Sequence, residues 1–273
     1  MSSFTPWTPD DAREHIAVPS ADDDKYSRGV LGVITGSTDY PGAAVLGVEA
    51  ALRTGVGMVR YLGAERPADF VLRRRPETVT APGRVQAWLL GSGMDAATRD
   101  SATVARLHDA LAEGLPTVID AGALDLLDRH TGPAIITPHF RELARVVGAT
   151  TEEIAADPAG WAVRSAEKLG VTVLLKGHDS YVANPDGTRL VASSAPAWLA
   201  TAGAGDALGG ILGALVATHA DAVEADGAML ARLAATACVI HGLAAGRAGG
   251  GGPFTVLDLA ENVSAVITGL LGR

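Results

Sequence analysis

Residues 30–35, VLGVIT, form a short apolar run, which is followed by a turn-rich loop at 36–42 and a helical stretch of small residues at 43–53. An unbroken apolar run of this length is typical of a strand that is buried on both faces. The glycines at 55 and 57 mark the end of the helix. This succession of strand, loop and helix predicts one unit of a parallel sheet.

The same succession recurs along the chain, without an internal repeat of fixed period. Strands that alternate with helices indicate a mostly parallel sheet with helices on both faces. The sequence NPDG at 184–187 predicts the turn of a hairpin. Further strands are predicted at 58–62, 87–90, 117–120, 134–137, 171–176, 181–183 and 189–191, and further helices at 98–112, 141–147, 158–169, 205–218, 227–245 and 257–270.

Length and composition are those of one globular domain. The chain has 273 residues, of which 48% are hydrophobic and 19% are charged, so it can bury a large core. No linker is long or polar enough to divide it, and we expect a single domain over residues 1–273.

Charge and cysteine content exclude several classes of partner and location. The net charge of −9 repels phosphate backbones and anionic lipids, so we expect no nucleic acid and no membrane as partner. A lone cysteine, Cys238, forms no internal disulfide, which suits the cytoplasm. The N-terminus shows no basic region before an apolar run, so we expect no signal peptide.

The apolar segments predict core and subunit contacts rather than membrane spans. The stretches at 208–216 and 233–240 are shorter than the roughly 20 residues that a membrane span needs. We expect apolar helices such as 227–245 to be exposed and therefore available for contacts between subunits.

The strongest candidate site is TAGAGD at 201–206, which leads directly into an apolar helix. The first N–H groups of a helix lack partners within it and attract anions. Gly203 and Gly205 let the backbone approach a phosphate. A carboxylate beside that phosphate, Asp206, can accept a hydroxyl proton as the oxygen attacks phosphorus. The alternative is that Asp206 only caps an ordinary helix.

A second candidate is the loop that follows the strand at 171–176. A lysine and a glycine end this core strand, where a cation and backbone N–H groups can hold a nucleotide phosphate or adenosine. The alternative is a lysine that simply reaches solvent. The residues of this loop are Lys176, Gly177, His178, Asp179 and Ser180.

Several other polar residues leave function and structure open. His139 and Asp120 lie at the ends of predicted strands, where such a residue is more often a hydrogen-bonded structural group than a catalyst. GSGMDA at 91–96 fits a dinucleotide fingerprint formally, but a tight turn is the better interpretation. The arginines at 73–75 indicate a solvated face, and no closely spaced His and Cys residues predict a metal site.

Taken in order, these motifs resemble the ADP/ATP-dependent NAD(P)H-hydrate dehydratase family. The resemblance runs from about Lys25 to the C-terminus. It implies a ribokinase-like three-layer α/β/α sandwich with a mostly parallel central sheet. We expect the stand-alone dehydratase, since the N-terminal epimerase domain of some relatives has no room here. The motifs are GAA at 42–44, ALRTGVG at 51–57, GSG at 91–93, DAGAL at 120–124, TPH at 137–139, KG at 176–177, NPDG at 184–187 and GAGD at 203–206.

The resemblance also implies an activity, in which the S form of the 6-hydroxylated hydrate of NADH or NADPH is dehydrated at the expense of ADP, giving AMP and phosphate. Mg²⁺ would bridge the phosphates, with ADP or ATP as co-substrate, and the protein would be a cytoplasmic homo-oligomer. Substrate contacts would come from Ala43, Gly93, His139 and Asp206, with Asp206 catalytic. Nucleotide contacts would come from Lys176, Gly177, His178, Asp179, Ser180, Gly203 and Gly205.

The sequence departs from the family pattern at Phe140 and Arg141, where relatives often have Pro and Gly, and at Ala204 and Ser180, where Thr is common. Two other functions share the same glycine-rich anion site. One is a ribokinase-like kinase of a small molecule such as a vitamin precursor, and the other is a nucleotide-binding regulator without catalysis.

Overall fold

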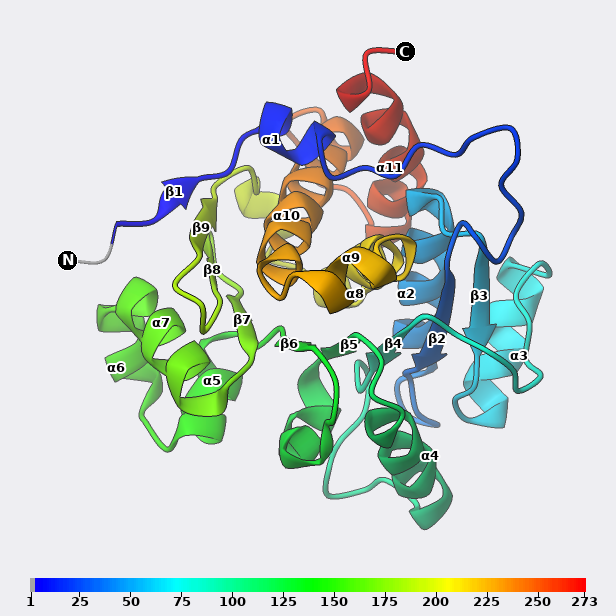
Figure 1. Ribbon diagram of the computed structural model, residues 1–273, viewed down its shortest axis with the longest axis horizontal. Coiled ribbons are helices and arrows are strands. Elements are labelled where there is room, and N and C mark those ends of the chain that lie inside the picture. The colour runs from blue at the N-terminus through cyan, green and yellow to red at the C-terminus, as the bar shows by residue number, and fades with distance from the viewer. Residues whose placement is uncertain (1–2) are drawn as a thin grey trace.

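The structure is a computed structural model that describes residues 3–273, and one sheet runs through its centre (Figure 1). The sheet has nine strands in the order β1-β9-β8-β7-β6-β5-β4-β2-β3. Every pair is parallel except the two that β8 makes with β7 and β9. The strands are β1 (Thr5–Pro6), β2 (Val30–Ile34), β3 (Met58–Tyr61), β4 (Ala87–Leu90), β5 (Thr117–Ile119), β6 (Ala134–Ile136), β7 (Thr172–Leu175), β8 (Ser180–Ala183) and β9 (Arg189–Ala192).

The central strands are buried on both faces, as their unbroken apolar sequences predict. All residues of β2, β4, β5, β6 and β7 are buried. One core cluster lies on each side of the sheet, because alternate side chains of a strand point to opposite faces. The predicted α/β class and mostly parallel sheet are therefore confirmed.

Helices form the two outer layers (Figure 1). A first layer contains α1 (Pro9–Arg13), α2 (Pro41–Thr54), α3 (Glu65–Arg74), α8 (Ala204–Thr218), α9 (Ala220–Ala225), α10 (Ala228–Gly249) and α11 (Val256–Leu270). The opposite layer contains α4 (Ser101–Ala112), the 3₁₀ segment η1 (Ala121–Arg129), α5 (Phe140–Val147), α6 (Thr151–Ala156) and α7 (Pro158–Leu169). A short 3₁₀ turn, η2 (Ala197–Leu199), precedes α8.

α2 and α8 pack closely against each other because both have glycine at the crossing. A Cβ added to Gly210 of α8 would lie 2.1 Å from the carbonyl oxygen of Gly47 in α2. α8 is otherwise apolar and almost wholly buried, so this contact holds its position over the sheet. Its first turn then lies at the edge where the parallel strands end.

The expectation that the helix at 227–245 is exposed is wrong. α10 spans 22 residues, and by length and composition alone it would suffice to cross a membrane. However, 83% of its most apolar 18-residue window is buried inside the protein. α10 packs against α8 and α11 and against the strands β7, β8 and β9, so its apolar surface belongs to the core.

The interpretation of the arginines at 73–75 as a solvated face is also wrong in part. Glu49 of α2 is completely buried, and Arg53, Arg74 and Arg75 all bind its carboxylate. Burial alone would raise the pKa of Glu49, but the hydrogen bonds from Arg75, Arg74 and Arg53 outweigh burial and hold its pKa below the ordinary value. This charged cluster joins α2 to α3, a helix that the sequence did not predict.

The glycine contact between α2 and α8 predicts a selective loss of stability. We expect Gly210→Ala to lower the free energy of unfolding by about 1–3 kcal/mol, because the new methyl group collides with backbone. A chemical denaturation curve measures this loss. The matched control is Gly246→Ala in α10, where no atom lies within 4 Å of the new Cβ. We expect it to leave stability unchanged or to increase it, and equal stabilities of the two variants would contradict the packing argument.

Candidate active site

The polar residues that end four neighbouring strands meet at one edge of the sheet. Ser92, Asp120, Thr137 and Lys176 follow β4, β5, β6 and β7, which are paired in this order. Asp120 accepts hydrogen bonds from Ser92 Oγ at 2.9 Å and from Thr137 Oγ1 at 2.7 Å. It also forms an ion pair with Lys176, with 2.9 Å between Nζ and Oδ1. The sheet therefore builds a buried ion pair where parallel α/β sheets bind ligands.

Both members of this pair are held in their charged forms. Burial would raise the pKa of Asp120, but the Lys176 ammonium and the hydroxyl donors lower it below the ordinary value. Burial would likewise lower the pKa of Lys176, but the charges of Asp120 and Glu142 raise it. Each ion thus compensates for the desolvation of the other.

The first turn of α8 faces the same edge. Gly203 precedes the helix with a φ of 92°, which favours glycine, and offers no side chain to cap it. Asp206 is the third residue of α8, and its carboxylate accepts no hydrogen bond within residues 3–273. Asp206 therefore makes no capping hydrogen bond, although it is the acidic residue of the first turn of α8.

Asp206 has the electrostatic environment of a base. Its burial and the nearby negative charge of Asp120 raise its pKa to about 6, and Lys176 lowers it only in part. A carboxylate with a raised pKa accepts a proton more readily than an ordinary one. Asp206 therefore lies ready for proton transfer near neutral pH.

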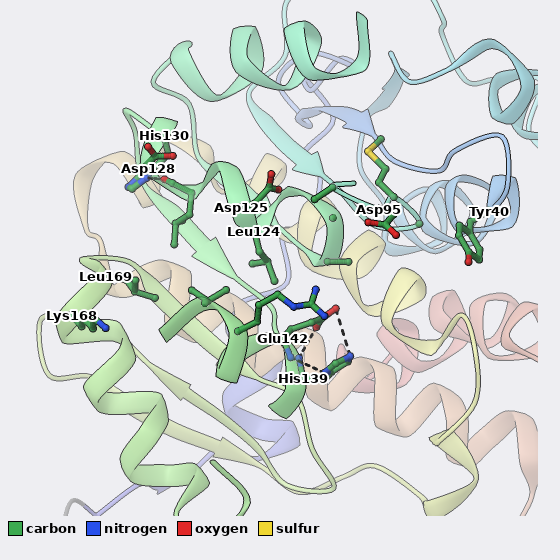
Figure 2. Close-up of a pocket in the computed structure, with 18 residues that line it drawn as sticks. Tyr40, Asp95, Leu124, Asp125, Asp128, His130, His139, Glu142, Lys168 and Leu169 are labelled. Atoms are coloured by element: carbon green, nitrogen blue, oxygen red, sulfur yellow. Dashed lines mark hydrogen bonds and ion pairs between the residues drawn. The ribbon is translucent and has the colours of Figure 1, made fainter. Parts of the chain in front are cut away.

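Two cavities lie side by side and share His139. The larger cleft has a volume of about 1110 Å³, and its lining includes Tyr40, Gly93 and Glu142 (Figure 2). The smaller cavity has a volume of about 230 Å³, and its lining includes Lys176 and Gly205. His139 lines both, so two ligands can approach each other at this residue.

Two of the four predicted substrate residues line the larger cleft, whereas Ala43 and Asp206 do not. Gly93 and His139 line it, and Ala43 touches Gly93, since a Cβ on Gly93 would lie 2.3 Å from the Ala43 Cβ. His139 also begins α5, because its Nδ1 accepts a hydrogen bond from the Glu142 backbone (Figure 2). The structural role that the sequence left open for His139 is therefore present beside its place in the cleft.

The predicted nucleotide residues are only partly brought together. Lys176, Gly177, Ser180 and Gly205 all line the smaller cavity. His178 lines a surface hollow that adjoins the smaller cavity, since His139, Lys176 and Gly177 line both. Asp179 and Gly203 line neither the larger cleft nor the smaller cavity, and Gly203 instead packs against Leu46 of α2.

The structure adds residues to the site that the sequence did not single out. Ser92 and Thr137 bind Asp120, and Glu142 lies 4.0 Å from Lys176. His241 of α10 lines the smaller cavity, and burial lowers its pKa to about 4, so its imidazole is neutral. Its Nε2 has no hydrogen-bond partner in the described chain. Their positions at predicted strand ends could have indicated Ser92 and Thr137 from the sequence. His241 lies in the middle of a helix, and no sequence pattern indicates it.

A resident metal site is not apparent. No group of three or more His, Cys, Asp or Glu side chains suited to a metal ion occurs among the described residues.

Comparison with known proteins identifies relatives of this chain. A family model described as NAD(P)H-hydrate dehydratase matches residues 31–254. The bifunctional NAD(P)H-hydrate repair enzyme Nnr of Mycobacterium leprae is 40% identical over 227 residues, which are 79% of this chain and 46% of that protein. The chain thus spans about half the length of such relatives. The ADP-dependent (S)-NAD(P)H-hydrate dehydratase of Xanthomonas campestris is 33% identical over 76% of this chain and 79% of its own length.

A solved structure supports the fold. The ADP/ATP-dependent NAD(P)H-hydrate dehydratase of Bacillus subtilis, co-crystallised with ATP and Mg²⁺, superimposes with a TM-score of 0.85 at 24% identity. The match covers 99% of this chain and 100% of that one. With the family model matching most of its length, this chain belongs to the NAD(P)H-hydrate dehydratase family.

Proposed function

We propose that this protein restores NADH or NADPH from the S form of its 6-hydroxylated hydrate, with ADP as phosphoryl donor and AMP and phosphate as products. The observation that carries the proposal is the position of Asp206, a partly buried carboxylate with a raised pKa in the first turn of α8. Asp206 lines neither cavity itself, but Gly205 before it lines the smaller cavity together with Lys176. The ADP dependence follows the dehydratases to which the chain is 33–34% identical.

The chemistry begins with the hydroxyl of the hydrate, since hydroxide is a poor leaving group and phosphate a good one. Asp206 takes the hydroxyl proton while the oxygen attacks the β-phosphorus of ADP, and the bond between phosphorus and the AMP oxygen breaks. Loss of phosphate, with a proton from the neighbouring carbon, then restores the dihydropyridine ring. Free N–H groups at the start of α8 stabilise the charge on the transferred phosphoryl group.

The two cavities supply the two binding sites that this reaction needs. We assign the larger cleft, beside Ala43, Gly93 and His139, to the hydrate. We assign the smaller cavity to the nucleotide, with Lys176, Gly177, Ser180 and Gly205 close to its phosphates or adenosine. Gly203 would act by starting α8, and His178 and Asp179 would act only through the backbone of their loop.

Mg²⁺ enters this proposal bound to the nucleotide. The described residues form no metal cluster of their own, and Mg²⁺ typically binds through substrate phosphates and few protein ligands. When bound, it would neutralise charge on the phosphates. The homo-oligomer, the cytoplasmic location and the absence of nucleic-acid and membrane partners stay predictions.

The first test is Asp206→Asn, which keeps the size of the side chain and removes the base. We expect turnover to fall at least about 100-fold, the usual contribution of general-base catalysis. The assay follows the near-ultraviolet absorbance of NADH or NADPH formed from each hydrate, with ADP or ATP. ADP binding, measured by calorimetry, should remain, and thermal stability should not fall, because a buried neutral amide needs no charge partner. Full activity of this variant would refute the assignment, and a phosphate ester as final product would indicate the kinase instead.

The raised pKa of Asp206 predicts the acid side of the pH profile. The base must be ionised, and its ionised fraction falls as the pH drops below its pKa of about 6. We therefore expect kcat/KM to be constant above this pH and to fall about tenfold per pH unit well below it. A profile that stays flat to pH 4.5 would contradict a base of this pKa.

The third test concerns the nucleotide. We expect Lys176→Ala to weaken ADP binding roughly 10–100-fold, because hydrogen bonds to charged groups contribute about 1.5–3 kcal/mol. Titration calorimetry measures the Kd. The matched control is Lys25→Ala, in an exposed loop remote from the cavity residues, which should bind ADP as the wild type does. Unchanged affinity of Lys176→Ala would remove this lysine from the nucleotide site.

A further inference from the structure

Asp120 is bound by side chains from three other strand ends, and none of these contacts requires a ligand. Oδ2 accepts a hydrogen bond from Ser92, and Oδ1 accepts from Thr137 and from the Lys176 ammonium. The Asp120 side chain is only 5% exposed, against 19% for Lys176. Asp120 is therefore behind the cavity wall, and Lys176 is the member of the pair that lines the cavity.

The ammonium of Lys176 has other acidic neighbours to which it can turn. Glu142 Oε2 lies 4.0 Å away. Asp206 follows Gly205, where an added Cβ would lie 3.5 Å from Lys176 Nζ, and the charge of Asp206 helps to raise the pKa of Lys176. The side chain of a lysine is long and flexible, so Asp120, the partner at 2.9 Å, determines the position of the Lys176 ammonium. Ser92 and Thr137 fix the orientation of that partner, because a carboxylate with two hydroxyl donors cannot rotate without losing one of them.

We propose that Asp120 is a positioning residue for phosphoryl transfer: it holds the Lys176 ammonium at the wall of the smaller cavity, beside Gly205, and keeps that charge from pairing with Asp206. The proposal rests on the function proposed above. Asp120 itself touches neither substrate, because the lysine and the hydroxyl groups of Ser92 and Thr137 surround it.

The arrangement also protects the base. The charged groups that act on Asp206 are Asp120 at the end of β5 and Lys176 at the end of β7, while Glu142 of α5 acts on Lys176. A direct pair between Lys176 and Asp206 would stabilise the ionised carboxylate and make it a weaker base. By binding the Lys176 ammonium at 2.9 Å, Asp120 keeps it from pairing with Asp206, which therefore stays basic.

The test is Asp120→Asn, which preserves shape and removes the charge. We expect kcat to fall roughly 100-fold, the effect of misplacing a catalytic charge by about 1 Å. The pKa of Asp206 should fall, because Asp206 loses the repulsion of Asp120 and gains the attraction of Lys176. The acid limb, which is the fall of kcat/KM at low pH, should therefore move to lower pH. The KM for the hydrate should change little. If Asp120 had a purely structural role, its loss would lower activity by the same factor at every pH, and the pH profile would not move.

Three control variants separate charge from packing. Ser92→Ala and Thr137→Val each remove one neutral donor and keep the Asp120 charge and its pair with Lys176, so the acid limb should move much less than in Asp120→Asn. Asp109→Asn makes the same chemical change at an exposed position on α4 and should behave as wild type. An acid limb that does not move in Asp120→Asn, or that moves equally in Ser92→Ala, would overturn the proposal.

A measurement without turnover distinguishes this proposal from the proposed function. The chain has only three lysines, Lys25, Lys168 and Lys176, so NMR of ¹³C-labelled lysine side chains resolves each titration. The Lys176 pKa is raised in the wild type, and it should fall in Asp120→Asn. If the wild type lacks dehydratase activity, the function fails, yet this titration still decides whether Asp120 holds Lys176. An unchanged Lys176 titration would overturn the positioning role.

A double variant covers the case in which Asp120→Asn fails to fold. Asp120→Asn combined with Lys176→Met leaves no unpaired buried ion, which is the main cause of instability when one partner of a buried pair is removed. If Asp120 acts through Lys176, the double variant at pH 8 should have the kcat of Lys176→Met alone. A further loss of more than about tenfold would show an independent role and would overturn the proposal.

Discussion

The ion pair between Asp120 and Lys176 is the contact around which the site is built. It is formed because β5 and β7 end at the same edge with β6 between them, so that an acid and a base come within 2.9 Å. Asp120 is buried and Lys176 is largely shielded from solvent, so each charge compensates for the desolvation of the other. The pair brings a fixed positive charge to the cavity wall and a fixed negative charge behind it. Asp206 experiences both: burial and the charge of Asp120 raise its pKa, and the charge of Lys176 lowers it in part.

The position of α8 completes this arrangement. Glycines at its crossing with α2 allow the two helices to touch through backbone, which places the first turn of α8 at the same edge of the sheet. Free N–H groups, a cation and a carboxylate then surround one small volume, where each acts more strongly than it would in water. Packing in the apolar layer thereby determines the geometry of the polar site. The larger cleft and the smaller cavity meet at His139, which suits a reaction between two bound molecules.

The course of the chain was largely predictable, and the environment of its side chains was less so. Unbroken apolar runs correctly indicated the buried strands, since a strand covered on both faces has no polar side to show. The same apolar signal was misleading for α10, because hydrophobicity predicts burial or contact but does not say which neighbours cover the helix. Arg74 and Arg75 were misread because their partner, Glu49, lies 25 residues away from Arg74 along the chain. Charge pairs across such separations leave no local pattern.

The amino-acid sequence determined the class of fold, the glycine-rich start of α8 with Asp206, and the residues that end each strand, because these depend on local order along the chain. The tertiary structure alone decided that Asp120 binds Lys176, that Glu142 and His241 join the site, and that His178 and Asp179 do not line the smaller cavity. The reason is physical: hydrogen bonds and charge pairs act over a few ångströms in space, and only the folded sheet brings its strand ends within that distance.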